Sequence, residues 1–146
     1  MQCTKKTKKV ELMKHSFNIE VRTYELDSYN HVNNAVYLQY FEYARMKFLE
    51  KIGFDYQALI NDGYLLYVTK ATISYKHSAF LFDTLTIEVE SKKLGAVSGT
   101  IVEVACNQNG TICAEAEIGW ACVRKETGRP TKLPEKYIVE GLKPQN

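Results

Sequence analysis

The sequence contains no apolar run approaching the roughly 18 residues that a membrane-spanning helix needs. It has no Cys-x-x-Cys pair and only three histidines, so a zinc site of the usual spacing cannot be drawn. The first nine residues are polar and include four lysines, and they lack the apolar region of a secretory signal. From these absences we expect a soluble cytoplasmic protein with no membrane span, no metal site and no bound cofactor.

The basic balance of the chain is confined to its beginning. The net charge is +2, but residues 1–12 alone carry four lysines against one glutamate. The remainder therefore has no basic excess, which argues against a nucleic-acid partner. We divide the chain into a basic tail, residues 1–14, and one domain, residues 15–146. Met13 is a second candidate for the start of translation, because strand-like sequence follows it at once.

Length and composition are those of one globular domain. The chain has 146 residues, of which 45% are hydrophobic and 25% charged, enough to bury a core without disulfides or metals. Cys106, Cys113 and Cys122 lie in apolar, strand-like runs. We expect them to be small, reduced core residues.

The hydrophobic pattern predicts an α+β fold. Alternating apolar residues predict a strand over residues 15–25, and an almost wholly apolar segment predicts a buried helix from about Asn34 to Ile52. Gly53 is expected to end this helix, and Asp55 to cap a short second one. Four strands should follow, over residues 64–78, 84–93, 97–107 and 111–125, with Asn109-Gly110 as a hairpin turn; the tail from Gly128 should leave regular structure. The prediction is one antiparallel five-stranded sheet around a long central helix. Its open edges favour association of copies.

The polar segment between the first strand and the helix is the candidate site. Residues 27–34 contain one carboxylate (Asp27), one imidazole (His31) and three carboxamides. Polar groups just before a helix lie near its free N–H groups and the positive end of its dipole. Such a place can stabilise a developing oxyanion beside a carboxylate. Asp27 has a second interpretation, as a residue whose side chain only shapes the turn.

The run Y-E-L-D-S-Y-N-H-V-N-N-A-V-Y, with Y-F-E-Y-A-R downstream, resembles the hotdog-fold acyl-CoA thioesterases of the 4-hydroxybenzoyl-CoA thioesterase type. The similarity extends over roughly residues 15–135. It implies hydrolysis of an acyl-CoA to the free acid and CoA, with Asp27 as nucleophile or general base. It also implies that the backbone N–H of Asn34 polarises the thioester carbonyl. The sequence departs from the family pattern at Asn30, where glycine is common; asparagine is the other residue that best tolerates a positive φ.

The resemblance further implies a homodimer, often paired into a tetramer, with active sites at the dimer interface. CoA phosphates in this family usually meet surface Lys or Arg, and Lys92 and Lys93, before a turn, are candidates here. A solvated turn is the alternative interpretation of these two lysines. The acyl group preferred is left open.

The remaining polar residues of the segment have structural interpretations. His31 is expected to order the loop, and Asn33 to cap the helix together with Asn34. Glu42 and Arg45, three residues apart, are expected to pair on the helix, with Glu42 as a possible second carboxylate in the cavity. Two other functions stay open: an acyl-thioester hydratase using Asp27 and His31, and a non-catalytic acyl-thioester binding protein.

Overall fold

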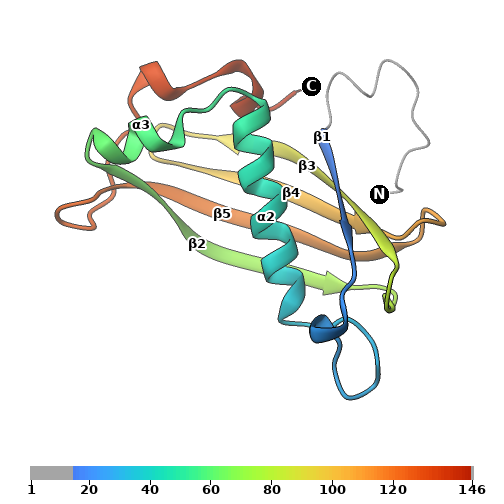
Figure 1. Ribbon diagram of the computed structural model, residues 1–146. Helices are drawn as coiled ribbons and strands as arrows, with labels where there is room; N and C mark the ends of the chain where they lie inside the picture. Colours follow the sequence, from blue (N-terminus) through green and yellow to red (C-terminus); the bar gives the residue numbers. More distant parts are fainter. Residues whose placement is uncertain (1–14, 146) are drawn as a thin grey trace.

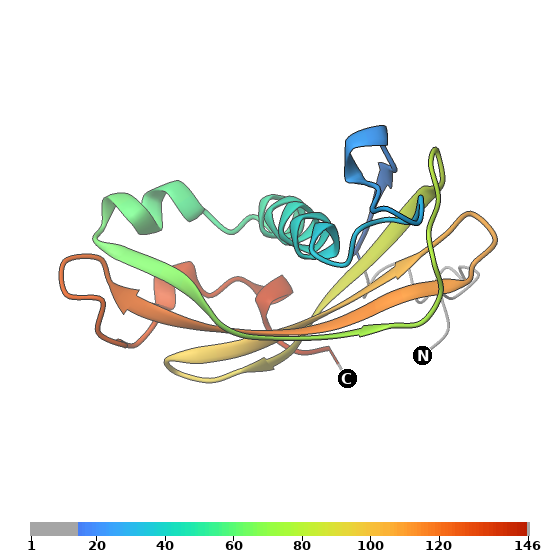
Figure 2. The same cartoon turned by 90° about the horizontal axis from the view of Figure 1, so that it is seen from below.

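The computed structural model describes residues 15–145, in which a long helix lies across one antiparallel five-stranded sheet (Figure 1). The sheet has the order β1-β3-β4-β5-β2. Its strands are β1 (His15–Glu20), β2 (Tyr64–Tyr75), β3 (Thr84–Leu94), β4 (Ser98–Cys106) and β5 (Ile112–Arg124). The long helix is α2 (Val36–Lys51), followed by the short helix α3 (Tyr56–Asn61). The predicted α+β architecture is confirmed, and Figure 2 shows the sheet curving beneath α2.

Several predicted boundaries are corrected. The first strand ends at Glu20, and the chain then forms the 3-10 turn η1 (Thr23–Glu25). Helix α2 begins at Val36, two residues later than predicted, and Ala35 is its N-cap residue. The tail after Gly128 is not free of regular structure, because it forms η2 (Glu135–Tyr137) and η3 (Glu140–Leu142). Leu133, Tyr137 and Leu142 are buried there, so apolar side chains hold the tail on the domain.

The turn and cap signals of the sequence are confirmed. Gly53 follows α2 with φ +79°, and Gly110 has φ +78° in the β4–β5 hairpin. Both angles are ones that glycine adopts without steric cost. The Asp55 carboxylate accepts a hydrogen bond of 3.0 Å from the Ala58 N–H at the start of α3. Backbone conformation and one nearby hydrogen bond thus determine these turns and helix ends.

Helix α2 is less enclosed than its sequence predicts. It buries one side against the sheet through Tyr37, Tyr40, Phe41, Ala44, Phe48 and Leu49. On another side Leu38 is 45% exposed and Met46 42% exposed. An apolar helix surface left open by the protomer's own sheet is a surface that a second chain can cover.

Strand β2 forms an open edge of the sheet (Figure 1). Tyr67 and Val68, in its first half, are 48% and 54% exposed. A register shift between Val68 and Lys70 marks a β-bulge. On both sides of the bulge, β2 residues pair with alternate β5 residues: Leu66 with Cys122, Val68 with Trp120, Ile73 with Ala116 and Tyr75 with Ala114. Because alternate residues of a strand share a face, these four β2 side chains all lie on the helix side of the sheet.

The cysteine prediction is confirmed at two positions and wrong at a third. Cys113 and Cys122 are buried free thiols. Cys106, also buried, is disulfide-bonded. The predicted basic tail and the alternative start at Met13 lie outside the described residues. Within residues 15–145, no helix has the length and hydropathy needed to cross a membrane.

Candidate active site

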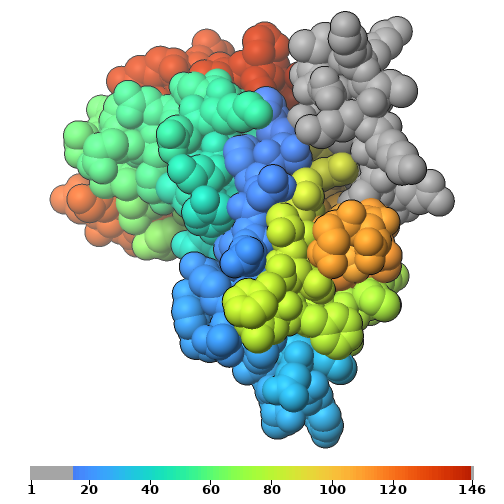
Figure 3. Space-filling view, turned by 45° about the vertical axis from the view of Figure 1, so that its right-hand side comes forward, coloured from blue at the N-terminus to red at the C-terminus, as the bar shows by residue number. Residues whose placement is uncertain are grey.

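The loop between β1 and α2 is closed at its base by backbone pairing. Leu26 and Val32 form an isolated antiparallel bridge, and the Asn33 N–H donates to the Glu25 carbonyl over 2.9 Å. Within the loop, the Asp27 N–H donates to the His31 carbonyl over 2.7 Å. Asn30 has φ 63°, so the predicted left-handed conformation at this position is confirmed. The loop projects from one end of the molecule (light blue in Figure 3).

Asp27 uses one carboxylate oxygen to shape this loop. Its Oδ1 accepts hydrogen bonds from the Tyr29 N–H at 2.8 Å and from the His31 N–H at 3.1 Å. The turn-shaping interpretation is therefore confirmed for Oδ1. Among residues 15–145, nothing donates a hydrogen bond to Oδ2. The same side chain thus shapes the loop and retains an oxygen for chemistry.

The hydrogen bonds at the start of α2 do not include the Asn34 N–H among the described residues. Asn33 accepts hydrogen bonds from the N–H groups of the two residues after Asn34. Its Oδ1 accepts from the Ala35 N–H at 2.9 Å, and its carbonyl accepts from the Val36 N–H. The Asn34 N–H donates to no acceptor among the described residues, while the Asn34 carbonyl accepts from the Tyr75 hydroxyl at 2.9 Å. The expected N-cap pair of Asn33 and Asn34 is therefore wrong: Ala35 is the N-cap residue and α2 has no side-chain cap, although Asn33 binds the Ala35 N–H just before the helix.

Asp27 and Asn34 line one pocket of about 340 Å³. The rest of its wall comes from the loop and helix (His31, Val32, Tyr37) and from the end of β2 and the residues after it (Tyr75, Lys76, His77, Ser78). The sequence analysis predicted that Asp27 and Asn34 belong to one site, and both line this pocket. It missed residues 75–78, for which the only signal was a polar cluster at the end of a strand.

His31 is held against these β2-end residues. Its Nδ1 lies 3.2 Å from the Ser78 hydroxyl, and its ring meets the Phe80 ring edge-on at 5.1 Å between centroids. Its backbone groups pair with Asp27 as described above. These contacts agree with the expectation that His31 orders the loop. Grouped metal ligands are absent from this site and from the rest of residues 15–145.

The chain resembles proteins of known sequence and structure. The model of the thioesterase-like superfamily matches residues 21–140. The chain belongs to this superfamily. It is 34% identical over 116 residues to the long-chain acyl-CoA thioesterase FadM of Escherichia coli strain K12, covering 79% of this chain and 87% of FadM.

Two further relatives cover most of the chain. The acyl-CoA thioester hydrolase YbgC of Escherichia coli O6:H1 is 30% identical over 126 residues, which are 85% of this chain and 94% of YbgC. The crystal structure of YbaW, a probable thioesterase from Escherichia coli, superposes with a TM-score of 0.75 at 33% identity, covering 84% of this chain and 92% of YbaW. The expected hotdog fold and thioesterase family are thus confirmed.

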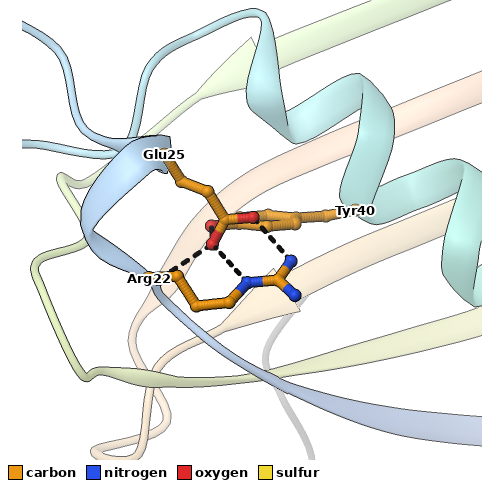
Figure 4. Close-up of polar contacts among 3 residues, drawn as sticks. All are labelled: Arg22, Glu25 and Tyr40. Carbon is orange, nitrogen blue, oxygen red and sulfur yellow. Dashed lines mark hydrogen bonds and ion pairs between the residues drawn. The ribbon is translucent and has the colours of Figure 1, made fainter.

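Polar residues outside the pocket connect the loop of Asp27 to the rest of this thioesterase-like domain. The Glu25 carboxylate, 3% exposed, accepts from the Arg22 guanidinium at 2.7 and 3.1 Å and from the Tyr40 hydroxyl at 3.0 Å (Figure 4). Burial alone raises the pKa of Glu25, but the hydrogen bonds from Arg22 and Tyr40 outweigh burial and keep this pKa below its ordinary value. The same contact, together with burial, raises the pKa of Tyr40. The sequence analysis did not predict this contact between Tyr40 and Glu25.

The predicted pair of Glu42 and Arg45 is replaced by a longer-range one. Arg45 Nη1 lies 3.6 Å from Oε1 of Glu103, a fully buried residue of β4. Burial raises the pKa of Glu103 to about 8, although Arg45 opposes this shift. Helical spacing cannot reveal such a pair, because the partner comes from a strand far along the chain.

Lys92 and Lys93 do not line the pocket of Asp27 within this protomer. They lie near the end of β3, where Lys93 pairs with Thr100, whereas the pocket lies near the beginning of that strand. Lys92 forms an ion pair with Glu117 of β5. Their contact with CoA phosphates stays a prediction.

Proposed function

We propose that this protein is an acyl-CoA thioesterase whose chemistry is carried by Asp27 and the Asn34 N–H. Water and R–CO–S–CoA give the carboxylic acid R–COOH and CoA–SH. One observation carries the proposal: Asp27 Oδ2 and the Asn34 N–H, both without a partner among the described residues, belong to one pocket. The names of FadM and YbgC support the reaction class.

In this mechanism the thioester carbonyl accepts a hydrogen bond from the Asn34 N–H. That bond strengthens as the oxygen gains negative charge, and it lowers the barrier selectively. Asp27 Oδ2 then acts in one of two ways. As a nucleophile it attacks the carbonyl carbon, expels CoA thiolate and forms a mixed anhydride, which water hydrolyses. As a general base it takes a proton from the attacking water while the C–S bond breaks.

The surroundings of the pocket suit a CoA thioester. Lys76 and His77 bring basic side chains to its wall, and we assign them to the phosphates of CoA. Lys92 and Lys93 of a partner subunit are further candidates for the phosphates. CoA thioesters are made inside cells, so the proposal includes a cytoplasmic location.

The proposed assembly is a homodimer through β2, with pairing of dimers into tetramers. The unpaired edge of β2 and the open side of α2, both rich in exposed apolar residues, support this choice. Pairing about a two-fold axis joins the two β2 edges antiparallel and extends the sheet across both subunits. The end of one β2, with Tyr75, then lies beside the beginning of the other.

The test is steady-state hydrolysis of aromatic, short-chain and long-chain acyl-CoAs, followed by release of the CoA thiol. On the best substrate we expect Asp27→Asn to lower kcat at least about 100-fold. Glu126→Gln, which removes an exposed carboxylate elsewhere, should keep the wild-type rate. Asn34→Ala retains the backbone N–H and should lose much less than Asp27→Asn. Full activity of Asp27→Asn would remove Asp27 from its role.

The same assay separates the two alternative functions. A hydratase using Asp27 and His31 would add water to an enoyl-CoA without releasing thiol. A non-catalytic binding protein would retain acyl-CoAs of every chain length without turnover. Either result would replace hydrolysis as the function.

A further inference from the structure

A second hollow, the Arg45 cleft, lies between α2 and the strands β5 and β2. We define it by Glu42 and Arg45 of α2, Leu66 and Val68 of β2, and Ile118 and Trp120 of β5. Its volume is about 110 Å³, and most of its wall is apolar. It shares no residue with the pocket of Asp27. Its size and lining are those of a place for a slender apolar group.

Two residues that line this apolar cleft each carry a buried hydrogen-bond donor without an acceptor among the described residues. Neither Arg45 Nη1 nor Trp120 Nε1 makes a hydrogen bond among the described residues. The 3.6 Å from Arg45 Nη1 to Glu103 Oε1 is too long for one. A buried donor without an acceptor costs free energy. A ligand oxygen that accepts hydrogen bonds from these donors would remove that cost.

The Trp120 indole is held in place by its neighbour across the sheet. Trp120 pairs with Gly99 of β4, and a Cβ at Gly99 would lie 2.5 Å from Trp120 Cζ2. No larger residue at Gly99 leaves the ring where it is. The indole ring therefore packs directly on the Gly99 backbone, and its N–H is a buried donor.

The apolar wall of the cleft and the Glu42 side chain favour a neutral oxygen over a carboxylate. Glu42 is exposed and lines the cleft, so a ligand carboxylate would lie close to an acidic side chain. Moving a carboxylate from water into a mostly apolar cleft also costs more free energy than moving a neutral oxygen. A hydroxyl or keto oxygen accepts from Arg45 and Trp120 without adding a charge.

Antiparallel pairing of β2 strands brings this cleft to an active site. Leu66 and Val68 lie near the beginning of β2 and face the helix side, as does Tyr75 at its end. Tyr75 lines the pocket of Asp27. In a two-fold β2 pair, the Arg45 cleft of one subunit therefore lies beside Tyr75 of the partner subunit. An acyl chain attached to a thioester at one Asp27 has a route into the cleft of the other subunit.

We propose that the Arg45 cleft binds the distal part of the acyl chain and selects aliphatic chains that carry a neutral oxygen, a hydroxyl or keto group, far from the thioester. This inference rests on the proposed thioesterase function and names its substrate class. Arg45 and Trp120 determine specificity in it, and the bond-breaking step stays with Asp27 and Asn34.

The experiment compares acyl-CoAs of equal length that differ only by a terminal hydroxyl, over a series of chain lengths. The readout is the ratio of kcat/KM for the hydroxylated substrate to that for the plain one. We expect the wild-type ratio to reach about 10 at the length that fits the cleft. Trp120→Phe and Arg45→Met should each bring this ratio towards one. Tyr43→Phe, which removes a hydroxyl from the exposed side of α2 outside the cleft, should keep the wild-type ratio.

Two controls keep the outcomes distinct. Melting curves verify folding of both variants, and Trp120→Phe keeps an aromatic ring should Arg45→Met fail to fold. Hydrolysis with a ratio near one at every length overturns the inference, leaves the thioesterase proposal standing and assigns the donors to ordered water. If no CoA thioester is hydrolysed, the thioesterase proposal fails. Calorimetric binding of the same substrate pairs then decides the inference, and equal affinities overturn it.

Discussion

The Tyr40 hydroxyl donates a 3.0 Å hydrogen bond to Glu25 Oε1, joining the buried side of α2 to the residue whose carbonyl closes the loop of Asp27. Glu25 is otherwise bound by Arg22, which lies before it in the same turn. The loop is thereby attached to α2 at two places. One is the Tyr40 hydroxyl in the helix, and the other is the start of the helix, which follows the loop directly. Rigid support of this kind would hold Asp27 in the geometry that the proposed hydrolysis requires.

Tyr40→Phe tests this support. The variant keeps the ring but removes one donor from a buried carboxylate, so we expect a loss of about 1–3 kcal/mol in the free energy of unfolding. Urea denaturation measures it. Tyr43→Phe, on the exposed side of the same helix, is the matched control and should be unchanged. Equal midpoints for both variants would show that the Tyr40 contact adds nothing to stability.

Asn30 should tolerate glycine but not alanine. Its φ of 63° is a left-handed conformation, which costs about 1–2 kcal/mol for an ordinary residue. We expect Asn30→Ala to lower both stability and the rate of hydrolysis, whereas Asn30→Gly should keep the rate. Thermal melts and thioester assays on the two variants check this. An alanine variant as stable and active as the glycine variant would contradict it.

Glu103 should make stability depend on pH. Its pKa is about 8 in the folded protein and 4.5 is the ordinary value, so between these pH values the folded state holds a proton that the unfolded state has lost. The free energy of unfolding therefore falls as pH rises from about 4.5 to 8, and this contribution is flat outside that window. Glu103→Gln lacks this dependence. Its stability relative to the wild type should rise across the window.

Denaturation series at pH 5, 7 and 9 on both proteins measure the effect. The difference between the two proteins at pH 9 should exceed that at pH 5 by several degrees in Tm. Parallel pH profiles for the wild type and Glu103→Gln would show that Glu103 titrates normally.

Val68→Asp should weaken the dimer. Val68 is 54% exposed in the protomer and lies next to the bulge in the open edge strand. A carboxylate there would be buried in a β2–β2 interface, at a cost that favours the monomer. Sedimentation velocity over a range of protein concentrations gives the readout. Val97→Asp, at another partly exposed valine in the turn between β3 and β4, should keep the wild-type state, and unchanged association of Val68→Asp would exclude this edge.

Features that depend on a few neighbouring residues were readable from the sequence. Asn30 adopts its positive φ, Gly53 ends a helix, Asp55 caps the next one, and Asn109-Gly110 turns a hairpin, because each depends on backbone sterics or on one nearby hydrogen bond. The pattern of apolar residues likewise predicted five strands and one long helix. The motif around Asp27 predicted the thioesterase family.

Contacts between distant segments were decided only by the tertiary structure. Pairing of β2 with β5 carries residues 75–78 to the loop of Asp27, and crossing of α2 over β4 places Arg45 beside Glu103 instead of Glu42. The sequence alone determined which residues carry reactive groups and which turns they lie in. What those groups meet depends on strand register and helix placement, which arise from packing of the whole core, and no local pattern contains that information.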